Sequence, residues 1–475
     1  MADFDEASQA FLAWLRHTGA EINPKIKLED LRHRDAGRGV VAIQDIAEHE
    51  LLFRIPRSAI LSVENSLLSS EIPASTFNAL GPWLSLILVM LYENLNGSSS
   101  NWSSYFSVLP SEFNTLMFWT KDELAELQAS AVVDKIGKES ADEMFLEQLV
   151  PVIIEISEVF FAGDTRAKQK AEEMRSPANL ELMHKMGSLI MAYAFDIESS
   201  TPPKNVDEDG YASEEEDEAL PKGMVPLADM LNADADQCNA RLFYQDRYLD
   251  MKALKPIKAG EEVFNDYGPL PRSDLLRRYG YITDNYAQYD VVEIQMDLVA
   301  DLATAAGIWS TERVEYLDEQ EILDSGYDIT VSEPFTLQES LSPELIILVE
   351  TLLLPVEEFD RIKQKGKLPK PEKITGAGAK LLHKIVQTRI AQYATSLEED
   401  SRVLHADSTV GGVTSKSKDR RFAMARAVRS AEKKLLRQAE EALAELTARG
   451  GGALKRQRDV DGDVEMGGTG KKQRA

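Results

Sequence analysis

The N-terminal part of the chain alternates apolar and polar positions in a way that predicts one helix followed by β-strands. Residues 8–18 carry apolar side chains at helical spacing, which indicates a short amphipathic helix. Three strands are expected: one at residues 25–28, one that follows a glycine turn within residues 37–43, and one at residues 51–56. Pro56 closes the third run, as suits an edge strand or a strand end. A first domain is therefore expected to begin as a β-rich unit.

Residues 66–197 change to helical periodicity. Thr120 and Ser140 are each followed three residues later by glutamate, which is the spacing of a capping box, so each is expected to open a helix. The second of these helices is expected to run to Phe161, and a methionine-rich helix to occupy residues 180–195. The pattern thus predicts a large helical block inserted among the strands.

An acidic stretch separates this helical block from a second set of strands. Residues 207–218 hold eight acids in twelve positions, which predicts a solvated, disordered loop within residues 199–222. A hairpin of two strands is expected over residues 240–251. After residue 290 helical patterns dominate, and a long helix with one apolar stripe is expected over residues 419–446.

The length and composition are typical of a globular protein with more than one domain. At 475 residues the chain exceeds one ordinary core, so two domains with tails are expected. Hydrophobic residues make up 43% of the chain and charged residues 28%, and no run of eighteen apolar residues predicts a membrane span. The first residues are acidic and lack the basic segment of a secretory signal.

Charge and metal-binding residue types narrow the partners. The formal net charge of −27 repels nucleic acid, so no direct nucleic-acid binding is expected and a basic protein partner is favoured. The alternative to a basic partner is that the negative charge only keeps the protein soluble. The single cysteine, Cys238, excludes a disulfide framework, and the six histidines lack metal-ligand spacing, so no metal site is expected. The chain is expected to act as a monomer.

Several common catalytic motifs are missing from the sequence. The chain has no phosphate-binding G-x-x-x-x-G-K-[ST], no G-x-G-x-x-G after a strand and no G-x-S-x-G nucleophile elbow. The glycine-rich residues 376–380 are expected to form a loop that leads into a helix and not a phosphate cradle. A doubly wound nucleotide site is therefore not supported.

Three segments carry the chemistry that the sequence suggests. In the first, Gly37-Arg38-Gly39, paired glycines let the backbone approach a ligand, with a plain turn as the alternative. The second segment is Pro226-Leu227-Ala228-Asp229-Met230-Leu231-Asn232. Its apolar residues indicate burial, so its carboxylate and amide need hydrogen-bond partners, and a capped turn is the alternative. The third segment is Glu261-Glu262-Val263-Phe264-Asn265-Asp266-Tyr267-Gly268, followed by Arg278-Tyr279-Gly280-Tyr281. One of its tyrosines could orient an amine and the other two could form the walls of a channel, and an ordinary aromatic core segment is the alternative.

Together and in this order, the three segments resemble the SET-domain protein lysine methyltransferases. The resemblance is strongest to the branch that holds the Rubisco large-subunit methyltransferase, SET domain-containing protein 6 and the fungal ribosomal lysine N-methyltransferase 4. It implies an α+β fold, with a β-rich SET domain that carries a helical insertion, followed by an all-α C-terminal substrate-binding domain. The expected boundaries are 1–20 for an N-terminal helix, 21–290 for the SET domain (insertion about 66–197, acidic disordered loop about 199–222), 291–447 for the helical domain and 448–475 for a disordered basic tail.

The resemblance also implies roles for matching positions. Gly37, Arg38 and Gly39 would border S-adenosyl-L-methionine with backbone groups, and Asn232 would bond the amino-acid end of this cofactor. Ala233 stands where relatives carry histidine, which removes one side-chain contact and points to the fungal ribosomal subgroup. The other positions are Tyr193 on the cofactor side, Tyr267 as the catalytic tyrosine at the cofactor, and Trp102, Phe195, Tyr279 and Tyr281 on the substrate side. Buried helix packing is the alternative for Trp102 and Tyr193.

The activity implied by the resemblance is methylation of a protein lysine. The hydroxyl of Tyr267 would orient the amine, and the extra hydroxyl of Tyr281 would narrow the channel and favour monomethylation. The expected substrate is a large-subunit ribosomal protein. A histone or other nuclear protein is the first alternative, and a non-catalytic SET-like peptide-binding module is the second. Basic clusters at residues 455–458 and 471–474 have the spacing of a bipartite import signal, so the expected location is the nucleus, with the cytoplasm as a second.

Overall fold

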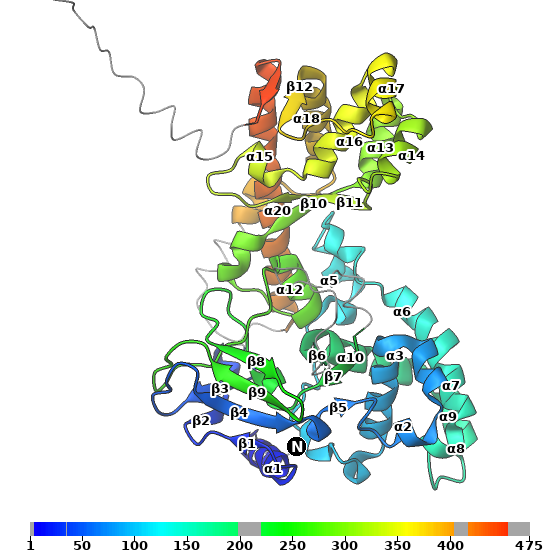
Figure 1. Cartoon of the computed structure of the whole chain (residues 1–475), viewed down its shortest axis with the longest axis vertical. Helices are drawn as coiled ribbons and strands as arrows, with labels where there is room; N and C mark the ends of the chain where they lie inside the picture. Colours follow the sequence, from blue (N-terminus) through cyan, green and yellow to red (C-terminus); the bar gives the residue numbers. More distant parts are fainter. Residues whose placement is uncertain (1–3, 35, 198–219, 403–416, 455–475) are drawn as a thin grey trace, which may run out of the picture. The chain divides into compact units, whose positions relative to one another are not determined.

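A computed structural model describes residues 4–34, 36–197, 220–402 and 417–454 of the chain (Figure 1). The expected basic clusters of the tail and most of the expected acidic loop lie outside the described residues. The chain divides into two compact units. Unit 1 comprises Met1–Phe118, Gly137–Pro269 and Arg278–Gly280, and unit 2 comprises Trp119–Ile136, Leu270–Arg277 and Tyr281–Ala475.

The β-strands of unit 1 form three small antiparallel sheets. The expected N-terminal helix is α1 (Phe4–His17), and the expected strands and hairpin are confirmed to within a few residues. In Figure 1 these strands gather on one side of unit 1. The sheets are β1 (Glu21–Ile22), β4 (Leu51–Pro56), β9 (Tyr248–Ala253) and β8 (Ala240–Tyr244) in that order, β2 (Ile26–Asp30) with β3 (Arg38–Ala42), and β5 (Leu61–Ser62), β7 (Lys222–Met224) and β6 (Ala194–Asp196).

Helices fill the other side of unit 1. The longest, α3 (Ala74–Leu95), is the one described helix long and apolar enough to cross a membrane by length and composition. Its second half is buried in the core of the unit, as in a core helix of a globular protein. The others are α2 (Leu68–Glu71), α4 (Ser103–Phe106), α6 (Lys138–Met144), α7 (Val150–Glu155), α8 (Ser157–Phe160), α9 (Ala167–Glu173) and α10 (Pro177–Tyr193).

Two of the expected helix boundaries differ from the structure. The capping box at Thr120 is confirmed and opens α5 (Lys121–Ala125) in unit 2. The one expected at Ser140 is wrong, because α6 has already begun at Lys138, after Gly137 turns the chain with a φ of 64°. The continuous helix expected to Phe161 is also broken, since a π-helical turn precedes the proline in the first turn of α7. A proline without an N–H interrupts the regular helical ladder.

Unit 2 is mainly helical and also contains two two-stranded sheets. Residues 376–380, expected as a loop, instead open α18, because the Thr375 hydroxyl accepts a hydrogen bond from Gly378 N at 3.0 Å. The expected tail begins with a short strand, β13. The elements are β10 (Val291–Gln295) with β11 (Gly326–Thr330), β12 (Lys373–Thr375) with β13 (Gly451–Ala453), and the helices α13 (Met296–Ala305), α14 (Thr311–Asp318), α15 (Leu337–Ser340), α16 (Pro343–Leu353), α17 (Val356–Gln364), α18 (Gly376–Ala391) and α20 (Ser417–Ala448).

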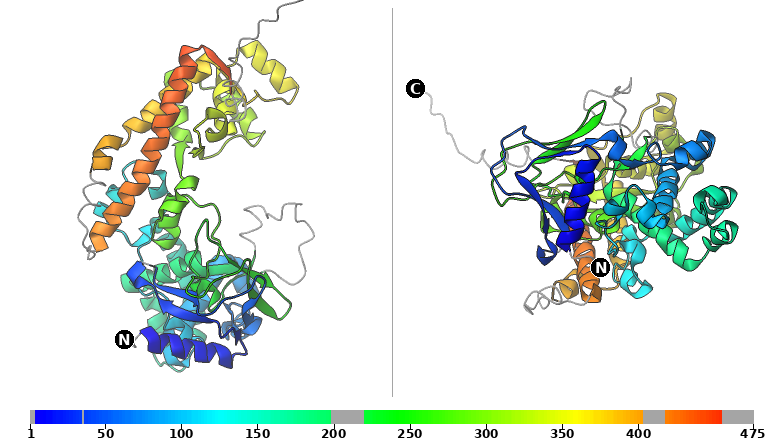
Figure 2. Two further views of the ribbon diagram at one scale, coloured as in Figure 1. Left: turned by 90° about the vertical axis from the view of Figure 1, so that its left-hand side faces the viewer. Right: turned by 90° about the horizontal axis from the view of Figure 1, so that it is seen from below.

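The long helix expected over residues 419–446 is confirmed as α20, which Figure 2 shows as one continuous helix. Its apolar stripe includes Leu435, Ala439 and Leu443, which are buried in the core of unit 2, and α20 packs along α18. Helix packing of this kind buries one face and leaves the other to solvent. The apolar pattern of this helix therefore determines the core of unit 2.

Candidate active site

The glycine turn before β3 needs its two glycines for different reasons. Gly37 has a φ of +65°, which L side chains rarely adopt, and its carbonyl accepts a hydrogen bond from Leu31 N at 2.7 Å. A Cβ atom at Gly39 would lie 2.4 Å from Leu31 Cδ1 and 2.8 Å from Glu262 Oε1. The backbone of β3 is thus packed directly against side chains from the second and third segments.

The second segment forms a short 3-10 turn, η7 (Ala228–Met230), next to this backbone. Leu227 precedes the turn at φ 74° and ψ −36°, a strained conformation for a leucine of the kind that clusters at functional sites. Asn232 then donates from Nδ2 to Glu262 Oε1 at 2.7 Å and to the Arg38 carbonyl at 3.3 Å. One amide therefore joins all three segments.

The third segment runs beside the second. Ala233 forms a β-bridge with Asn265, and Asn265 N donates to the Asn232 carbonyl at 2.9 Å. The Tyr267 hydroxyl donates to the Leu231 carbonyl at 3.1 Å. The backbone of the 231–233 stretch thus fixes both the strand that carries the tyrosine and the orientation of its phenol.

The expected catalytic tyrosine stacks on one of the two expected channel tyrosines. The rings of Tyr267 and Tyr279, the latter at the end of α12 (Arg272–Tyr279), have centroids 4.5 Å apart and planes at 13°. Gly280 follows with a φ of +75°, and a Cβ there would lie 2.7 Å from the backbone of Asn114 and Thr115. A glycine at this position lets the chain turn closely against the 114–115 backbone and helps to hold Tyr279 in its stack.

A cavity of about 190 Å³ opens where the first two segments meet the helical insertion. Four of the residues expected to border a cofactor line it: Gly37, Arg38, Tyr193 and Asn232. The other expected cofactor residues do not line it: Gly39 lies against the Asn232 amide, Ala233 forms its bridge with Asn265, and Tyr267 bonds to the Leu231 carbonyl. The remaining lining residues are Ala36, Val108, Leu109, Pro110, Asp229 and Met230.

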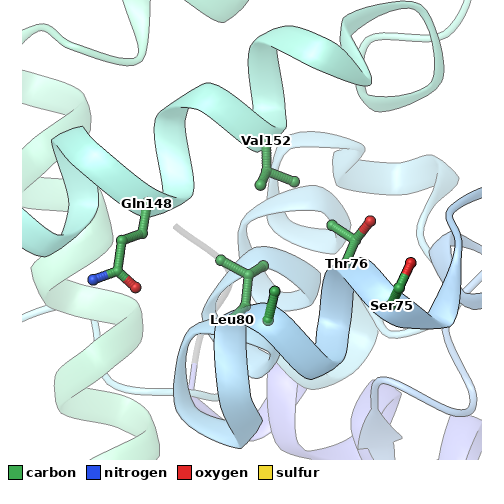
Figure 3. Close-up of a pocket in the computed structure, with 6 residues that line it drawn as sticks. Ser75, Thr76, Leu80, Gln148 and Val152 are labelled. Carbon is green, nitrogen blue, oxygen red and sulfur yellow. The ribbon is translucent and has the colours of Figure 1, made fainter.

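A wider hollow of about 440 Å³ lies elsewhere in unit 1, between α3 and the turn that leads into α7 (Figure 3). Its lining is apolar or uncharged and includes Ser75, Thr76, Leu80, Gln148 and Val152. No ionisable side chain lines it, and none of the expected site residues does. We therefore place the candidate site at the smaller cavity, where the glycine turn, the amide and the carboxyl group meet.

Buried polar groups give the smaller cavity its electrostatic character. Burial raises the pKa of Asp229 to about 7, against the lowering effect of the Tyr105 hydroxyl, which donates to Asp229 Oδ2. Burial, with the nearby Asp229 carboxyl, raises the pKa of Tyr193 to about 12. Burial also raises the pKa of Glu262 above its ordinary value, although Asn232 donates to it. The walls are therefore poorly hydrated and carry groups that are costly to ionise.

The substrate-side residues are placed less uniformly. Trp102 is 4% exposed in the core of unit 1, and its Nε1 donates to the Ala59 carbonyl at 3.0 Å, so the packing alternative describes it better than a substrate contact. Phe195 lies on β6, whereas the helix expected to include it, α10, ends at Tyr193. Tyr281 belongs to unit 2, so its place in a channel stays a prediction.

The sequence interpretation missed several residues that shape the cavity. Asp229 and Met230 lay inside the second segment but were given no role, although a carboxylate in an apolar stretch was the available signal. Tyr105 and the 108–110 stretch had no such signal, because their partners are far away in sequence. Within the part of the chain that the structure describes, no three His, Cys, Asp or Glu side chains gather as a metal site would require.

Comparisons with known proteins agree with this arrangement. The SET domain family model matches residues 37–268, and the model described as Rubisco LSMT substrate-binding matches residues 310–436. The chain is 35% identical over 377 residues to ribosomal lysine N-methyltransferase 4 of Saccharomyces cerevisiae, covering 74% of this chain and 73% of the relative. The chain belongs to the SET-domain protein lysine methyltransferases.

Other members of this SET-domain family show the same likeness over most of the chain. N-lysine methyltransferase SETD6 of Rattus norvegicus is 30% identical over 429 residues, covering 84% of this chain and 83% of the relative. The crystal structure of the SET domain of LSMT bound to lysine and AdoHcy matches with a TM-score of 0.65 at 20% identity, covering 93% of this chain and 92% of that one. The structural match confirms the fold expected from the three segments.

Proposed function

We propose that this SET-domain protein is an S-adenosylmethionine-dependent protein-lysine N-methyltransferase that acts on a ribosomal protein of the large subunit. The observation that carries the proposal is that the Asn232 amide, which lines the cavity, joins the three segments, while the Tyr267 hydroxyl bonds to the neighbouring Leu231 carbonyl. A relative named ribosomal lysine N-methyltransferase 4, similar over three quarters of the chain, supports the substrate class.

The residues of the cavity suit this cofactor. The open side of the Gly37 turn, where an added Cβ would meet nothing within 4 Å, leaves room for a ligand against the backbone. The Asn232 amide and the Asp229 carboxyl supply polar contacts, and Tyr193 supplies an aromatic wall. The cofactor, when bound, would supply a methyl group on a sulfonium. An uncharged amine would bond to the methyl carbon in line as the bond from sulfur to that carbon breaks and the neutral thioether leaves.

The tyrosines prepare the amine. The Tyr267 hydroxyl donates to the Leu231 carbonyl, and a phenol oxygen that donates can also accept a hydrogen bond, here from an amine. Free lysine has a pKa of about 10.4 and is charged at neutral pH, and a dry channel lowers that pKa. The stacked rings of Tyr267 and Tyr279 are suited to exclude water, and holding the reacting groups in line removes about 7–11 kcal/mol of the barrier. We assign the released proton to water in the channel.

The substrate proposal is tested by transfer of labelled methyl groups. Purified large-subunit ribosomal proteins and core histones are incubated in parallel with the purified protein and labelled S-adenosylmethionine. We expect label on a ribosomal protein and none on histones, in line with the relative that is named for ribosomal lysine methylation. Both substrates are basic and the net charge of −27 favours either one equally, so a selective result would not be an effect of charge. Label on histones alone would move the substrate to the first alternative. Calorimetry that detects no S-adenosylmethionine binding would leave only a non-catalytic peptide-binding module.

Three finer points belong to the same proposal. We propose monomethylation, because Tyr281 carries a hydroxyl at the position expected to narrow the channel, and mass spectrometry that finds mainly trimethyl-lysine would contradict this.

We propose a nuclear location from the basic clusters at residues 455–458 and 471–474, tested by imaging a fluorescent fusion with and without them. We propose a monomer, tested by light scattering of the purified chain.

A further inference from the structure

Asp229 is a buried carboxyl group with one oxygen left over. The residue lines the cavity and is 8% exposed. Its Oδ2 accepts the Tyr105 hydroxyl, while its Oδ1 has no hydrogen-bond partner among the described residues. A buried oxygen without a partner is costly, and native proteins rarely keep one without a reason. At the wall of a cavity, a ligand is the simplest reason.

The groups that face this carboxyl are tyrosine hydroxyls and the backbone N–H groups of Leu227 and Asp229, which lower its pKa and are outweighed by burial. Tyr105 comes from α4 and Tyr193 from the end of α10, and burial, followed by the charge of Asp229, raises the pKa of both phenols. The only cationic side chain among the residues that line the cavity is Arg38. Its guanidinium donates to the Val108 carbonyl at 2.9 Å and to Ser8 Oγ at 3.3 Å. Asp229 forms no ion pair among the described residues, so any positive charge beside it must come from a ligand.

The position of Asp229 in the chain places it near the expected reaction. It belongs to η7, and two residues later the Leu231 carbonyl accepts the hydroxyl of Tyr267. The next residue, Asn232, lines the same cavity. One short segment therefore carries the carboxyl, the anchor of the expected catalytic tyrosine and the amide expected to bind the cofactor.

We propose that Asp229 determines the preference of the site for the cationic methyl donor over its uncharged thioether product, by presenting a buried carboxylate to the sulfonium. The inference rests on the proposed function. Methyl transfer removes the positive charge from sulfur, so the attraction is present before the reaction and lost after it. In a poorly hydrated cavity such a charge pair is far stronger than in water. Asp229 is then a specificity-determining residue that favours binding of the donor and release of the product.

The preference should depend on pH. Burial raises the pKa of Asp229 to about 7, so the carboxyl is neutral below that pH and cannot attract a cation. Binding of the donor should therefore weaken as pH falls through 7, whereas binding of the product should not. Because the bound cation favours the carboxylate, donor binding near this pH should also release a proton to the buffer.

Titration calorimetry with three ligands tests the proposal. S-adenosylmethionine carries a sulfonium, sinefungin carries an ammonium in its place, and S-adenosylhomocysteine carries neither charge. The binding constants are measured at pH 8 for the full chain and for Asp229→Asn, which keeps the shape and can still accept from Tyr105. We expect the variant to bind the two cationic ligands about tenfold more weakly and the thioether within about twofold of the wild type.

A second variant tests the pH dependence separately. Tyr105→Phe removes the hydroxyl that lowers the Asp229 pKa, so the pH midpoint of donor binding should rise. Tyr92→Phe is the matched control, because Tyr92 is buried on α3 against Phe160 and does not line the cavity. Its midpoint should equal that of the wild type.

The outcomes separate the inference from the function on which it rests. Equal weakening of all three ligands in Asp229→Asn would mean a purely structural role and would overturn the inference, as would unchanged affinity for all of them. In both cases the proposed function stands, because the wild type still binds the donor. Failure of the wild type to bind any of the three ligands would overturn the proposed function itself.

Discussion

Two buried aspartates, one in each unit, show how differently the same side chain is used. In unit 2, Asp400 is 1% exposed; its Oδ1 accepts from Thr395 Oγ1 at 2.9 Å and from Arg429 Nη2 at 2.8 Å, and its Oδ2 accepts from Lys433. Burial alone would raise the pKa of Asp400, but these donors outweigh it and hold the pKa below its usual value. In unit 1, burial raises the pKa of Asp229 to about 7, and the Tyr105 hydroxyl and the backbone N–H groups of Asp229 and Leu227 offset only part of that effect.

The difference indicates which buried charge is structural and which is available to a ligand. Both oxygens of Asp400 accept hydrogen bonds, and the donors Arg429 and Lys433 lie on α20, so this charge holds α20 to the rest of unit 2. Glu432, which lies on α20, is intermediate: Ser130 and Tyr393 each donate to one of its oxygens, and burial raises its pKa to about 7. Asp229 alone among the three has an unsatisfied oxygen and a cavity beside it.

The largest effect is expected from breaking the saturated network. Arg429→Met removes a buried guanidinium that bonds Asp400 and Glu126. Breaking a buried pair typically lowers the free energy of unfolding by about 3–5 kcal/mol. Equilibrium urea denaturation of the full chain measures the loss, and binding of S-adenosylmethionine by the folded variant should be unchanged.

The control for this substitution lies on the same helix. Arg437→Met removes an exposed pair with Glu398, which solvent screens, so it should lower the free energy of unfolding far less than Arg429→Met. The same loss from both variants would contradict the assignment of Asp400 as a structural charge. Because the pKa of Asp400 is lowered, the contribution of the network is present above the unfolded pKa of about 3.9 and lost as pH falls through the lower folded value.

The next effect is on chemistry and not on stability. Tyr267→Phe removes the hydroxyl bonded to the Leu231 carbonyl and should lower kcat by about 10²-fold or more. Affinity for S-adenosylmethionine should stay nearly intact, since the ring and its stack on Tyr279 remain. Steady-state kinetics and calorimetry check the two parts, with Tyr92→Phe as the matched control. Normal turnover by the variant would remove Tyr267 from the mechanism.

Glu432 offers a smaller, pH-dependent effect. With a folded pKa of about 7 and an unfolded pKa of about 4.3, this carboxyl holds a proton in the folded state that the unfolded state releases. Stability should therefore fall by about 1–3 kcal/mol as pH rises between these values and then level off. Glu432→Gln should remove that part of the slope. Urea denaturation at pH 5 and 8 measures this pH dependence of the free energy of unfolding for the wild type and for Glu432→Gln. The same pH dependence in both proteins would show that Glu432 does not titrate in this range.

The smallest effect is expected at the glycine turn. Gly39→Ala places a Cβ against Leu31 and Glu262, so it should cost about 1–2 kcal/mol and weaken S-adenosylmethionine binding, because the Asn232 amide must shift. Gly187→Ala on α10 is the control, since the added Cβ would lie at an ordinary contact distance of 3.8 Å from Ile87 and Trp83 of α3. Unchanged affinity in Gly39→Ala would mean that the turn does not shape the cavity.

Local signals in the sequence were enough to find the parts of the site that are fixed by the backbone. The strands β2, β3, β4, β8 and β9, the glycine turn, Asn232 and Tyr267 were predicted, because a positive φ, a buried amide and a tyrosine after a hairpin each leave a short pattern, whereas the short strands β5, β6 and β7 were not. The likeness to a known family then supplied their order and roles. What the structure adds is the contact between them, which no single segment encodes.

The parts that were missed depend on long-range packing. Tyr105 donates to Asp229 from 124 positions away, and nothing near Tyr105 in the sequence indicates a polar partner. Trp102 was given a substrate role, but tertiary packing takes its indole into the core. The capping box expected at Ser140 failed for a local reason, since a left-handed Gly137 starts the helix earlier. Short polar spacing alone could not reveal that competing start.

The most direct test of the account is a crystal structure of the full chain with S-adenosylhomocysteine. The account predicts the ligand in the cavity lined by Gly37, Tyr193, Asp229 and Asn232, with its sulfur directed toward Tyr267. Density for the ligand in the hollow between α3 and α7, or anywhere else that leaves this cavity empty, would contradict it.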